Sequence, residues 1–160
     1  MVSDQVVTQR NTILTSGERF SYLENEAGLP DYWTTLFVTV ELRSKSAQNT
    51  ILSVLGALRH LKLWEDANER DLVSEFAAGK FLTPIDIEAL YEHFTLKSSE
   101  AEKSLNIRKS DDVISMQIHH PHSISALETA SSHQQKNRMS VATRFLIFVG
   151  KLCTETPSIA

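Results

Sequence analysis

Cysteine is almost missing from this 160-residue sequence, in which Cys153 is the only one. A lone cysteine excludes an internal disulfide bond and any metal site built from a cysteine cluster. No apolar run approaches the roughly 20 residues that a membrane-spanning helix needs. The first residues, MVSDQVVTQRNT, lack the apolar centre of a signal peptide. We therefore expect a cytoplasmic protein without a membrane partner.

Motifs that mark common enzyme classes are also missing. Neither the phosphate-loop pattern GxxxxGK[ST] nor the nucleophile motif GxSxG occurs. Three histidines stand close together, His119, His120 and His122, but neighbours in an extended segment point in opposite directions and Pro121 prevents helical spacing. No carboxylate or cysteine stands at a spacing that would complete a tetrahedral metal site. We therefore expect no bound metal, no cofactor and no catalytic residue.

Positive charge is scarce, because 16 basic residues stand against 20 acidic ones and the formal net charge is −4. This balance argues against a uniformly basic nucleic-acid binder, but the charges are unevenly distributed. Residues 43–64 and 132–152 each carry four basic side chains and no acidic one, whereas residues 65–103 hold ten acidic and four basic side chains. Such polarisation can create a local positive face on an acidic chain.

The stretch from Arg43 to Trp64, RSKSAQNTILSVLGALRHLKLW, is predicted to form a helix of about five turns that Ser46 caps. Five apolar residues recur along it at steps of three and four and so share one face: Ile51, Val54, Leu55, Leu58 and Leu61. One interpretation is a core helix with a solvated polar face, which is the commoner case. The other is a helix whose N-terminal amides and basic side chains hold a phosphate backbone.

The residues before this helix favour β-structure. Residues 1–11 are polar and are expected to fray. Phe20 and Tyr22 alternate with Ser21 and Leu23, and a turn is predicted at residues 27–28. The run LFVTV at 36–40 is aromatic and β-branched, so we predict a small hairpin or a three-stranded sheet, although residues 33–43 are also compatible with a helix.

Two short helices and one long helix are predicted after the central helix. The first covers residues 69–78 and ends at Gly79. The second opens at Thr83 and Pro84, with Asp86 placed to complete a capping box. Residues 97–131 are expected to form a mobile connection with a short strand at 113–118. The last helix covers about 132–152 and has an apolar face made of Met139, Ala142, Phe145, Leu146, Val149 and Leu152. The predicted fold is mainly α, a four-helix bundle with a small N-terminal sheet.

Four segments resemble the core-binding domain of tyrosine recombinases and phage-type integrases. The central phrase, LRSKSAQNTILSVLGALRHLKLW, is similar to that family's "glS.nTi..yl.al..f..wl" pattern, which opens a small helical bundle. GERFSYLENEAGLPDYWTTLFVTVELR resembles the lead-in of a subgroup of integrase-like proteins. AAGKFLTPIDIEALYEHF and NRMSVATRFLIFVGKL resemble the short helices that follow and the closing "nRl.tv..yl.wl" helix. The segments occur in the family's order.

This resemblance implies a SAM-like core-binding domain over residues 43–160, with an insertion at about 97–131, behind a strand-rich lead-in over residues 1–42. It implies the DNA-binding N-terminal module of a site-specific recombinase, with double-stranded DNA as partner and a homo-oligomer on DNA as a further assembly. The residues expected to contact DNA lie on the two basic helices: Arg43, Lys45, Ser46, Gln48, Asn49, Thr50, Arg59, Lys62, Arg138 and Arg144.

The family's catalytic chemistry belongs to a C-terminal domain for which this chain has no room. There a tyrosine attacks the phosphodiester while arginines, a lysine and histidines stabilise the charge on phosphorus. Tyr22, Tyr32 and Tyr91 match no such motif. We therefore expect no enzymatic activity from this chain. The alternative function is a non-catalytic protein-interaction or oligomerisation domain, in which the N-terminal strands with Tyr32 and Trp33 dock onto a partner, although packing against the bundle is the commoner role of such aromatics.

Overall fold

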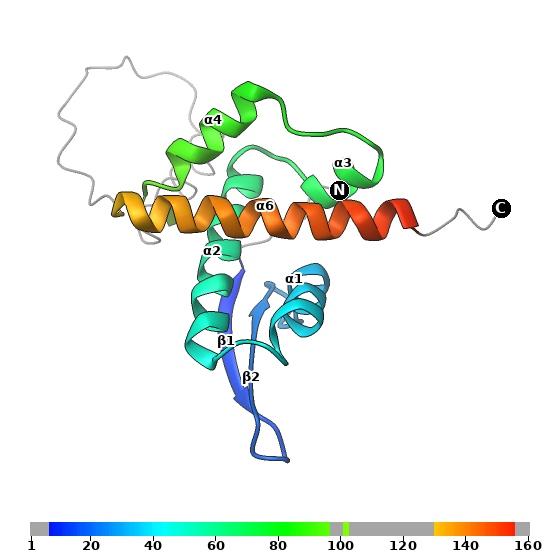
Figure 1. The fold of residues 1–160 in the computed structure, drawn as a ribbon, viewed down its shortest axis with the longest axis vertical. Coiled ribbons are helices and arrows are strands. Elements are labelled where there is room, and N and C mark those ends of the chain that lie inside the picture. The colour runs from blue at the N-terminus through cyan, green and yellow to red at the C-terminus, as the bar shows by residue number, and fades with distance from the viewer. Residues whose placement is uncertain (1–6, 97–100, 103–129, 156–160) are drawn as a thin grey trace.

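The computed structural model describes residues 7–96, 101–102 and 130–155, and within them the protein is mainly helical with one small antiparallel sheet (Figure 1). The elements run in the order β1 (Thr8–Ile13), β2 (Arg19–Glu24), α1 (Tyr32–Phe37), the π-helix η1 (Val38–Leu42), α2 (Gln48–Ala67), α3 (Leu72–Ala77), α4 (Pro84–His93) and α6 (Ser132–Glu155). The described residues thus hold five α-helices, one more than the four expected. The expected insertion lies outside them, apart from residues 101–102 and 130–131, as do the strand predicted at 113–118 and the histidines at 119–122.

The N-terminal hairpin confirms one of the two predicted sheet arrangements. Strands β1 and β2 pair antiparallel, with Thr8 opposite Glu24 and Ile13 opposite Arg19. Gly17 has a φ of +83°, a backbone conformation that glycine adopts without strain, in the turn that joins the strands. The expectation that residues 1–11 fray is wrong for Thr8–Asn11, because pairing with β2 satisfies the backbone of these polar residues.

Residues 36–40 were predicted as a strand first and as a helix second, and the helical alternative is right. Asp31 caps α1 by accepting the Thr34 N–H at 2.9 Å, and η1 continues the same turn. Phe37, Val38 and Leu42 become buried in the helical arrangement, so tertiary packing overrides the β-propensity of the run. Burial of apolar surface therefore decides this segment.

Helix α2 begins one residue later than expected. Its N-cap is Ala47, which has no side-chain hydrogen bond to offer, and the prediction that Ser46 caps the helix is wrong. The reason is that the Ser46 N–H donates to Leu42 O at 2.9 Å, which ties Ser46 to the end of η1. From Gln48 the helix runs for 20 residues to Ala67.

The two short helices follow the predicted capping chemistry. The N-cap of α3 is Asp71, which accepts the Ser74 N–H at 3.1 Å, so the helix starts later than the predicted Glu69. Gly79 has a φ of +75° just beyond the helix end, as expected of a terminating glycine. In α4, Thr83 and Asp86 form the predicted capping box in full.

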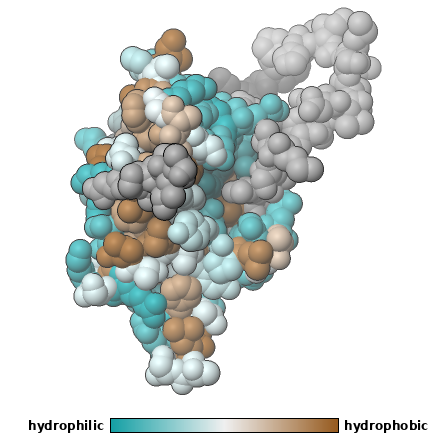
Figure 2. Space-filling model, turned by 90° about the vertical axis from the view of Figure 1, so that its right-hand side faces the viewer, coloured by the Kyte–Doolittle hydropathy of each residue, from teal (hydrophilic) through white to brown (hydrophobic). Residues whose placement is uncertain are grey.

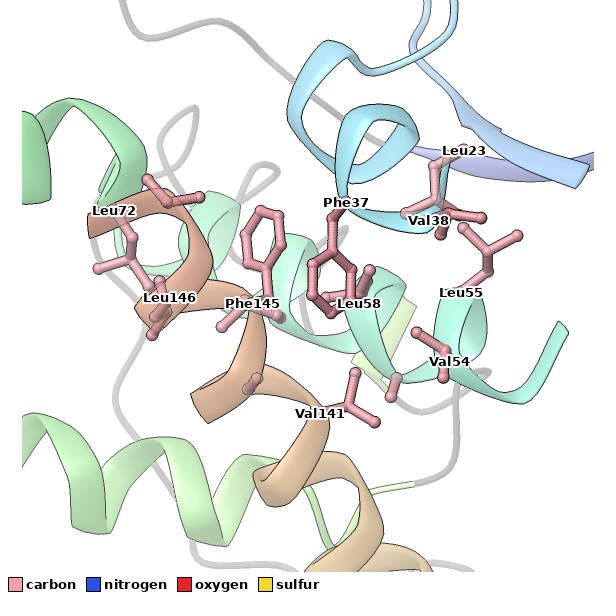
Figure 3. Close-up of a cluster of buried hydrophobic side chains, with 14 of the residues drawn as sticks. Leu23, Phe37, Val38, Val54, Leu55, Leu58, Leu72, Val141, Phe145 and Leu146 are labelled. Carbon is pink, nitrogen blue, oxygen red and sulfur yellow. The ribbon is translucent and has the colours of Figure 1, made fainter. Parts of the chain in front are cut away.

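Helix α6 confirms the predicted closing helix and lies across the other elements (Figure 1). It packs against α1, α2 and α3. Phe145 meets Phe37 of α1 edge to face with ring centroids 5.6 Å apart, and Leu146 and Leu72 belong to the same core cluster (Figure 3). Leu23 of β2 also belongs to this cluster, so the lead-in and the helices share a single core.

Tyr32 and Trp33 of α1 have different surroundings. Trp33 is half-buried and packs against the core, in agreement with its predicted packing role. Tyr32 is 67% exposed and touches Trp33 edge to face. In the part of the chain that the structure describes, no helix combines the length and apolar character that crossing a membrane requires.

Candidate nucleic-acid interface

Lys62 cannot belong to a DNA-contacting surface. Its side chain is buried, and its ammonium lies 3.1 Å from the carboxylate of Glu65, which is also buried. Burial alone would lower the pKa of Lys62, but the Glu65 carboxylate raises it above its ordinary value. Glu65 in turn accepts the Leu72 N–H at 2.8 Å, where α3 begins. The predicted role of Lys62 is therefore wrong, because this cation stabilises the junction between α2 and α3.

The side chain of Arg59 also binds other groups of the protein. Its Nε donates to Val7 O at 2.9 Å, and its Nη2 lies 2.5 Å from a carboxylate oxygen of Glu102. The side chain is only 20% exposed. Arg59 thus links the N-terminal strand region to α2, and its charge is balanced by an acidic partner.

Arg43 and Gln48 contact the hairpin beside the start of α2. Arg43 makes a bidentate ion pair with Glu18, at 2.9 and 2.7 Å, and its guanidinium lies over the Phe20 ring. Gln48 Nε2 donates to Ser21 Oγ at 2.6 Å. The Glu18 carboxylate raises the pKa of Arg43, which keeps the guanidinium charged but paired. Both side chains therefore hold the hairpin against α2.

Arg138 supports the end of α4. Its Nη1 donates to Phe94 O and to Leu96 O, each at 2.7 Å. These carbonyls follow the last turn of α4, where a cation satisfies acceptors that have no partner within the helix. Burial lowers the pKa of Arg138. Arg138, which was expected to contact DNA, therefore joins α6 to the end of α4.

Four of the ten predicted residues remain exposed. Lys45 lies in the turn before α2, Asn49 and Thr50 lie in its first turn, and Arg144 lies midway along α6. None of these four side chains has a hydrogen bond or ion pair to another side chain in the described residues. Ser46 is half-buried beside them. Of the ten residues predicted to contact DNA, these four are therefore exposed, whereas Arg43, Gln48, Arg59, Lys62 and Arg138 make contacts within the protein.

A polar groove between α2 and α6 was not predicted. Its volume is about 180 Å³, and it is lined by Ser53, Gly56, Ala57 and His60 of α2 and by Gln134, Asn137 and Arg138 of α6. A signal for its α2 wall was present in the sequence: residues 49, 53, 56 and 60 recur at helical steps and are polar or small. The α6 wall could not be predicted, because it depends on where α6 crosses α2.

His60 lies at the base of this groove and is neutral at physiological pH. Burial, together with the positive charges of Arg138 and Arg59 and with His93, lowers the pKa of His60 to about 3. His60 O is 3.1 Å from His93 Nε2, so the two histidines join α2 to α4. The groove therefore presents amide and hydroxyl groups around a neutral imidazole.

The start of α2 differs from the starts of the other capped helices. Side chains of Asp31, Asp71 and Thr83 accept backbone N–H groups at the starts of α1, α3 and α4. Ala47 at the start of α2 provides no such acceptor. Free N–H groups at a helix N-terminus, together with the helix dipole, favour an anionic oxygen. Exposed Lys45 and Asn49 lie on either side of this position in the sequence.

Among the described residues, no group of three or more histidine, cysteine, aspartate or glutamate side chains is arranged to hold a metal ion. Comparison of the chain with protein-family models, with curated proteins and with solved structures finds no match in any of the three. The comparisons therefore assign no function to this surface, and its interpretation depends on the residues described above.

Proposed function

We propose that this chain is a DNA-binding module of the core-binding type, from the N-terminal part of a site-specific tyrosine recombinase or integrase. The fold corresponds in this proposal to a SAM-like bundle in which α2 is the first helix and α6 the closing one. The sequence resemblance supports this assignment, and so does the location of both helices beside one polar groove. Double-stranded DNA is the partner.

The observation that carries the proposal is the uncapped start of α2 at the head of a polar face without acidic residues. Asn49 and Ser53 are one turn apart on this face, which continues into the groove at Gly56 and His60. A phosphate oxygen fits the free amides, and Lys45 adds a positive charge beside them. The amide group of Asn49 can pair with an adenine edge in the major groove.

Helix α6 supplies the second contact in this proposal. Asn137 lines the groove, and Arg144 is two turns further along the same side of the helix because the two are seven residues apart. Arg144 is exposed and free to reach a phosphate, whereas Arg138 is held by carbonyl groups. Phosphate contacts from both helices would fix the register of the module on the duplex.

Binding by the chain alone is expected to be weak. Only Lys45 and Arg144 of the predicted cations are exposed without an acidic partner among the described residues, and the net charge is −4. Two neutralised phosphates correspond to a slope of about −2 for log K against log salt. A dissociation constant in the range of roughly 1 to 100 micromolar is therefore expected, and a separate catalytic domain would add the rest of the affinity.

The experiment is a fluorescence titration of a labelled duplex at salt concentrations between about 50 and 200 mM. Lys45→Ala and Arg144→Ala should each weaken binding and reduce the size of the salt slope by about 0.9. Asn49→Ala should relax base preference and leave the slope unchanged. Lys80→Ala is the matched control, because Lys80 is a largely exposed lysine on the loop between α3 and α4.

Two results would refute the proposal. One is binding that is tight and independent of salt. The other is binding in which the Lys45 and Arg144 variants behave like the Lys80 variant. The second result would favour a protein-interaction domain instead, with Tyr32 as an exposed aromatic contact.

A further inference from the structure

Gly56 lies in the middle of α2, where a glycine is not expected. Glycine destabilises a helix relative to alanine, because it loses more backbone freedom when the helix forms. A positive φ would require a glycine, but the glycines with positive φ are Gly17, Gly28 and Gly79, which lie outside the helices. The backbone conformation at residue 56 therefore gives no reason for a glycine.

Packing within the protein gives no reason for this glycine either. A Cβ atom placed on Gly56 would meet no atom of the described residues within 4 Å, apart from neighbouring atoms of its own helix. The space in front of Gly56 belongs to the polar groove between α2 and α6, which this residue lines. Because a glycine allows another molecule to approach the backbone closely, the missing side chain leaves room for a ligand in this groove.

The groove around Gly56 is lined by groups that suit an anionic oxygen. Ser53 offers a hydroxyl group, and Gln134 and Asn137 offer amide groups that can donate hydrogen bonds. Among the described residues that line the groove, none is acidic. Arg138 lines it as well, but its Nη1 donates to two carbonyl groups at the end of α4. An anion in this groove would therefore be bound mainly by neutral donors.

The electrostatic potential at the base of the groove also favours an anion. Burial, followed by the charges of Arg138, His93 and Arg59, lowers the pKa of His60 to about 3. Burial opposes a charge of either sign, whereas the positive charge of Arg138 opposes a proton and attracts an anion. A neutral imidazole beside a guanidinium therefore suits a phosphate group better than an ammonium group.

We propose that the polar groove binds a phosphate group of the DNA backbone, with Gly56 at the point of closest approach. This inference rests on the proposed function, because the phosphate belongs to the duplex that α2 and α6 bind. Gly56 follows the exposed Asn49 by seven residues, which is about 10 Å along the helix. Phosphates of one strand recur about every 3.4 Å along the duplex axis, so a strand held at the start of α2 reaches the groove within a few nucleotides. This continuity favours DNA over a free phosphate ion.

The variant Gly56→Ala tests the proposal, because it adds one methyl group to the groove and removes no contact within the protein. It should raise the melting temperature by about 1–4 °C, since alanine favours the helix. In the duplex titration it should raise the dissociation constant by at least about fivefold, because the methyl group occupies the space of the phosphate. The salt slope should stay near that of the parent, since the donors in the groove are neutral. A purely structural role for Gly56 would not combine higher stability with weaker binding.

Gly150→Ala is the matched control on α6. A Cβ atom on Gly150 would lie 3.8 Å from Cδ1 of Phe76, which is an ordinary contact distance. Gly150 follows Arg138 by 12 residues, about 18 Å further along α6, toward the side of the molecule on which apolar and polar side chains are mixed (Figure 2). This variant should show a similar rise in melting temperature and should bind the duplex like the parent.

Two duplexes of unrelated sequence distinguish a phosphate from a base in the groove. A contact with the backbone carries no sequence information, so Gly56→Ala should weaken binding to both duplexes by the same factor. A loss confined to one duplex would place a base in the groove and overturn the proposal.

Inorganic phosphate distinguishes a free anion from DNA. Phosphate stabilises folded proteins in general, so it should raise the melting temperatures of the parent and of Gly56→Ala equally, relative to chloride at the same ionic strength. A larger rise for the parent would assign the groove to a free anion and overturn the proposal.

The titrations also separate this inference from the proposed function. If the parent binds the duplex and Lys45→Ala weakens binding, but Gly56→Ala binds like the parent, the inference about the groove alone is wrong. If the parent does not bind DNA, both the inference and the proposed function are wrong.

Discussion

The ammonium of Lys62 lies 3.1 Å from the carboxylate of Glu65, and both side chains are buried near the C-terminal end of α2. Glu65 also accepts the Leu72 N–H, so the ion pair fixes the turn from α2 into α3. Burying this ion pair costs desolvation free energy, which offsets much of its attraction. Its main effect is therefore to fix the geometry of the turn. The pair therefore fixes the position of the start of α3 relative to the end of α2.

Removing one member of this pair should destabilise the fold. Lys62→Met leaves the Glu65 carboxylate buried without its cation, and we expect the free energy of unfolding to fall by about 3–5 kcal/mol. Lys136→Met, on the exposed side of α6, should change it by less than about 0.5 kcal/mol. Lys62→Met/Glu65→Gln should recover part of the loss, because no unpaired charge remains. Urea unfolding measures all three, and equal stability of the two single variants would contradict the expectation.

His60 should make the stability depend on pH in the acid range. Burial lowers the pKa of His60 in the folded protein to about 3, below its ordinary value of 6.5. Between these values the unfolded chain binds a proton that the folded chain does not, so stability is lost as the pH falls from 6.5 toward 3. The slope from this residue approaches about 1.4 kcal/mol per pH unit. Replacing His60 with Gln should flatten the profile of unfolding free energy against pH.

A control for this pH effect is available on α6. His133 is exposed, so His133→Gln leaves the buried groups around His60 intact and should preserve the profile of the parent. A His60 variant whose profile matches that of the parent would show that other groups produce the acid loss.

Substitution of Arg138 should lower stability, whereas substitution of Arg144 should weaken DNA binding. Arg138→Met removes two charge-assisted hydrogen bonds to Phe94 O and Leu96 O and should lower the free energy of unfolding by about 2–3 kcal/mol. Arg144→Met should leave stability within about 0.5 kcal/mol of the parent and weaken DNA binding instead. Thermal unfolding and the duplex titration together check the pair. Reversed effects would mean that the closing helix contacts DNA through Arg138.

The chain alone should neither cleave nor ligate DNA. The family's reaction needs arginines, a lysine and histidines around the attacked phosphorus, and these belong to a separate domain in the proposed parent protein. Incubation with duplex DNA followed by denaturing electrophoresis should show no covalent adduct. An adduct through Tyr22, Tyr32 or Tyr91 would overturn both the domain assignment and the proposed function.

The sequence alone determined the elements whose signals are local. The capping box of Thr83 and Asp86 and the apolar face of α6 follow from spacing, because capping and helical periodicity involve residues within one or two turns. The hairpin strand β2 follows from alternation for the same reason. Lys45, Asn49 and Arg144 are exposed, as a DNA contact requires, and none of them belongs to an apolar stripe of the sequence.

Tertiary structure alone decided which polar residues are free. Lys62 and Arg138 are as hydrophilic as Lys45 and Arg144, but both make contacts inside the protein. Lys62 is buried with Glu65, which lies one turn further along α2. Arg138 donates to a carbonyl group at the end of α4, which is distant in the sequence. Residues 36–40 likewise become helical because Phe37 and Val38 reach the core that α6 completes. The polar groove arises where α6 crosses α2, and long-range packing of this kind leaves no local pattern in the sequence.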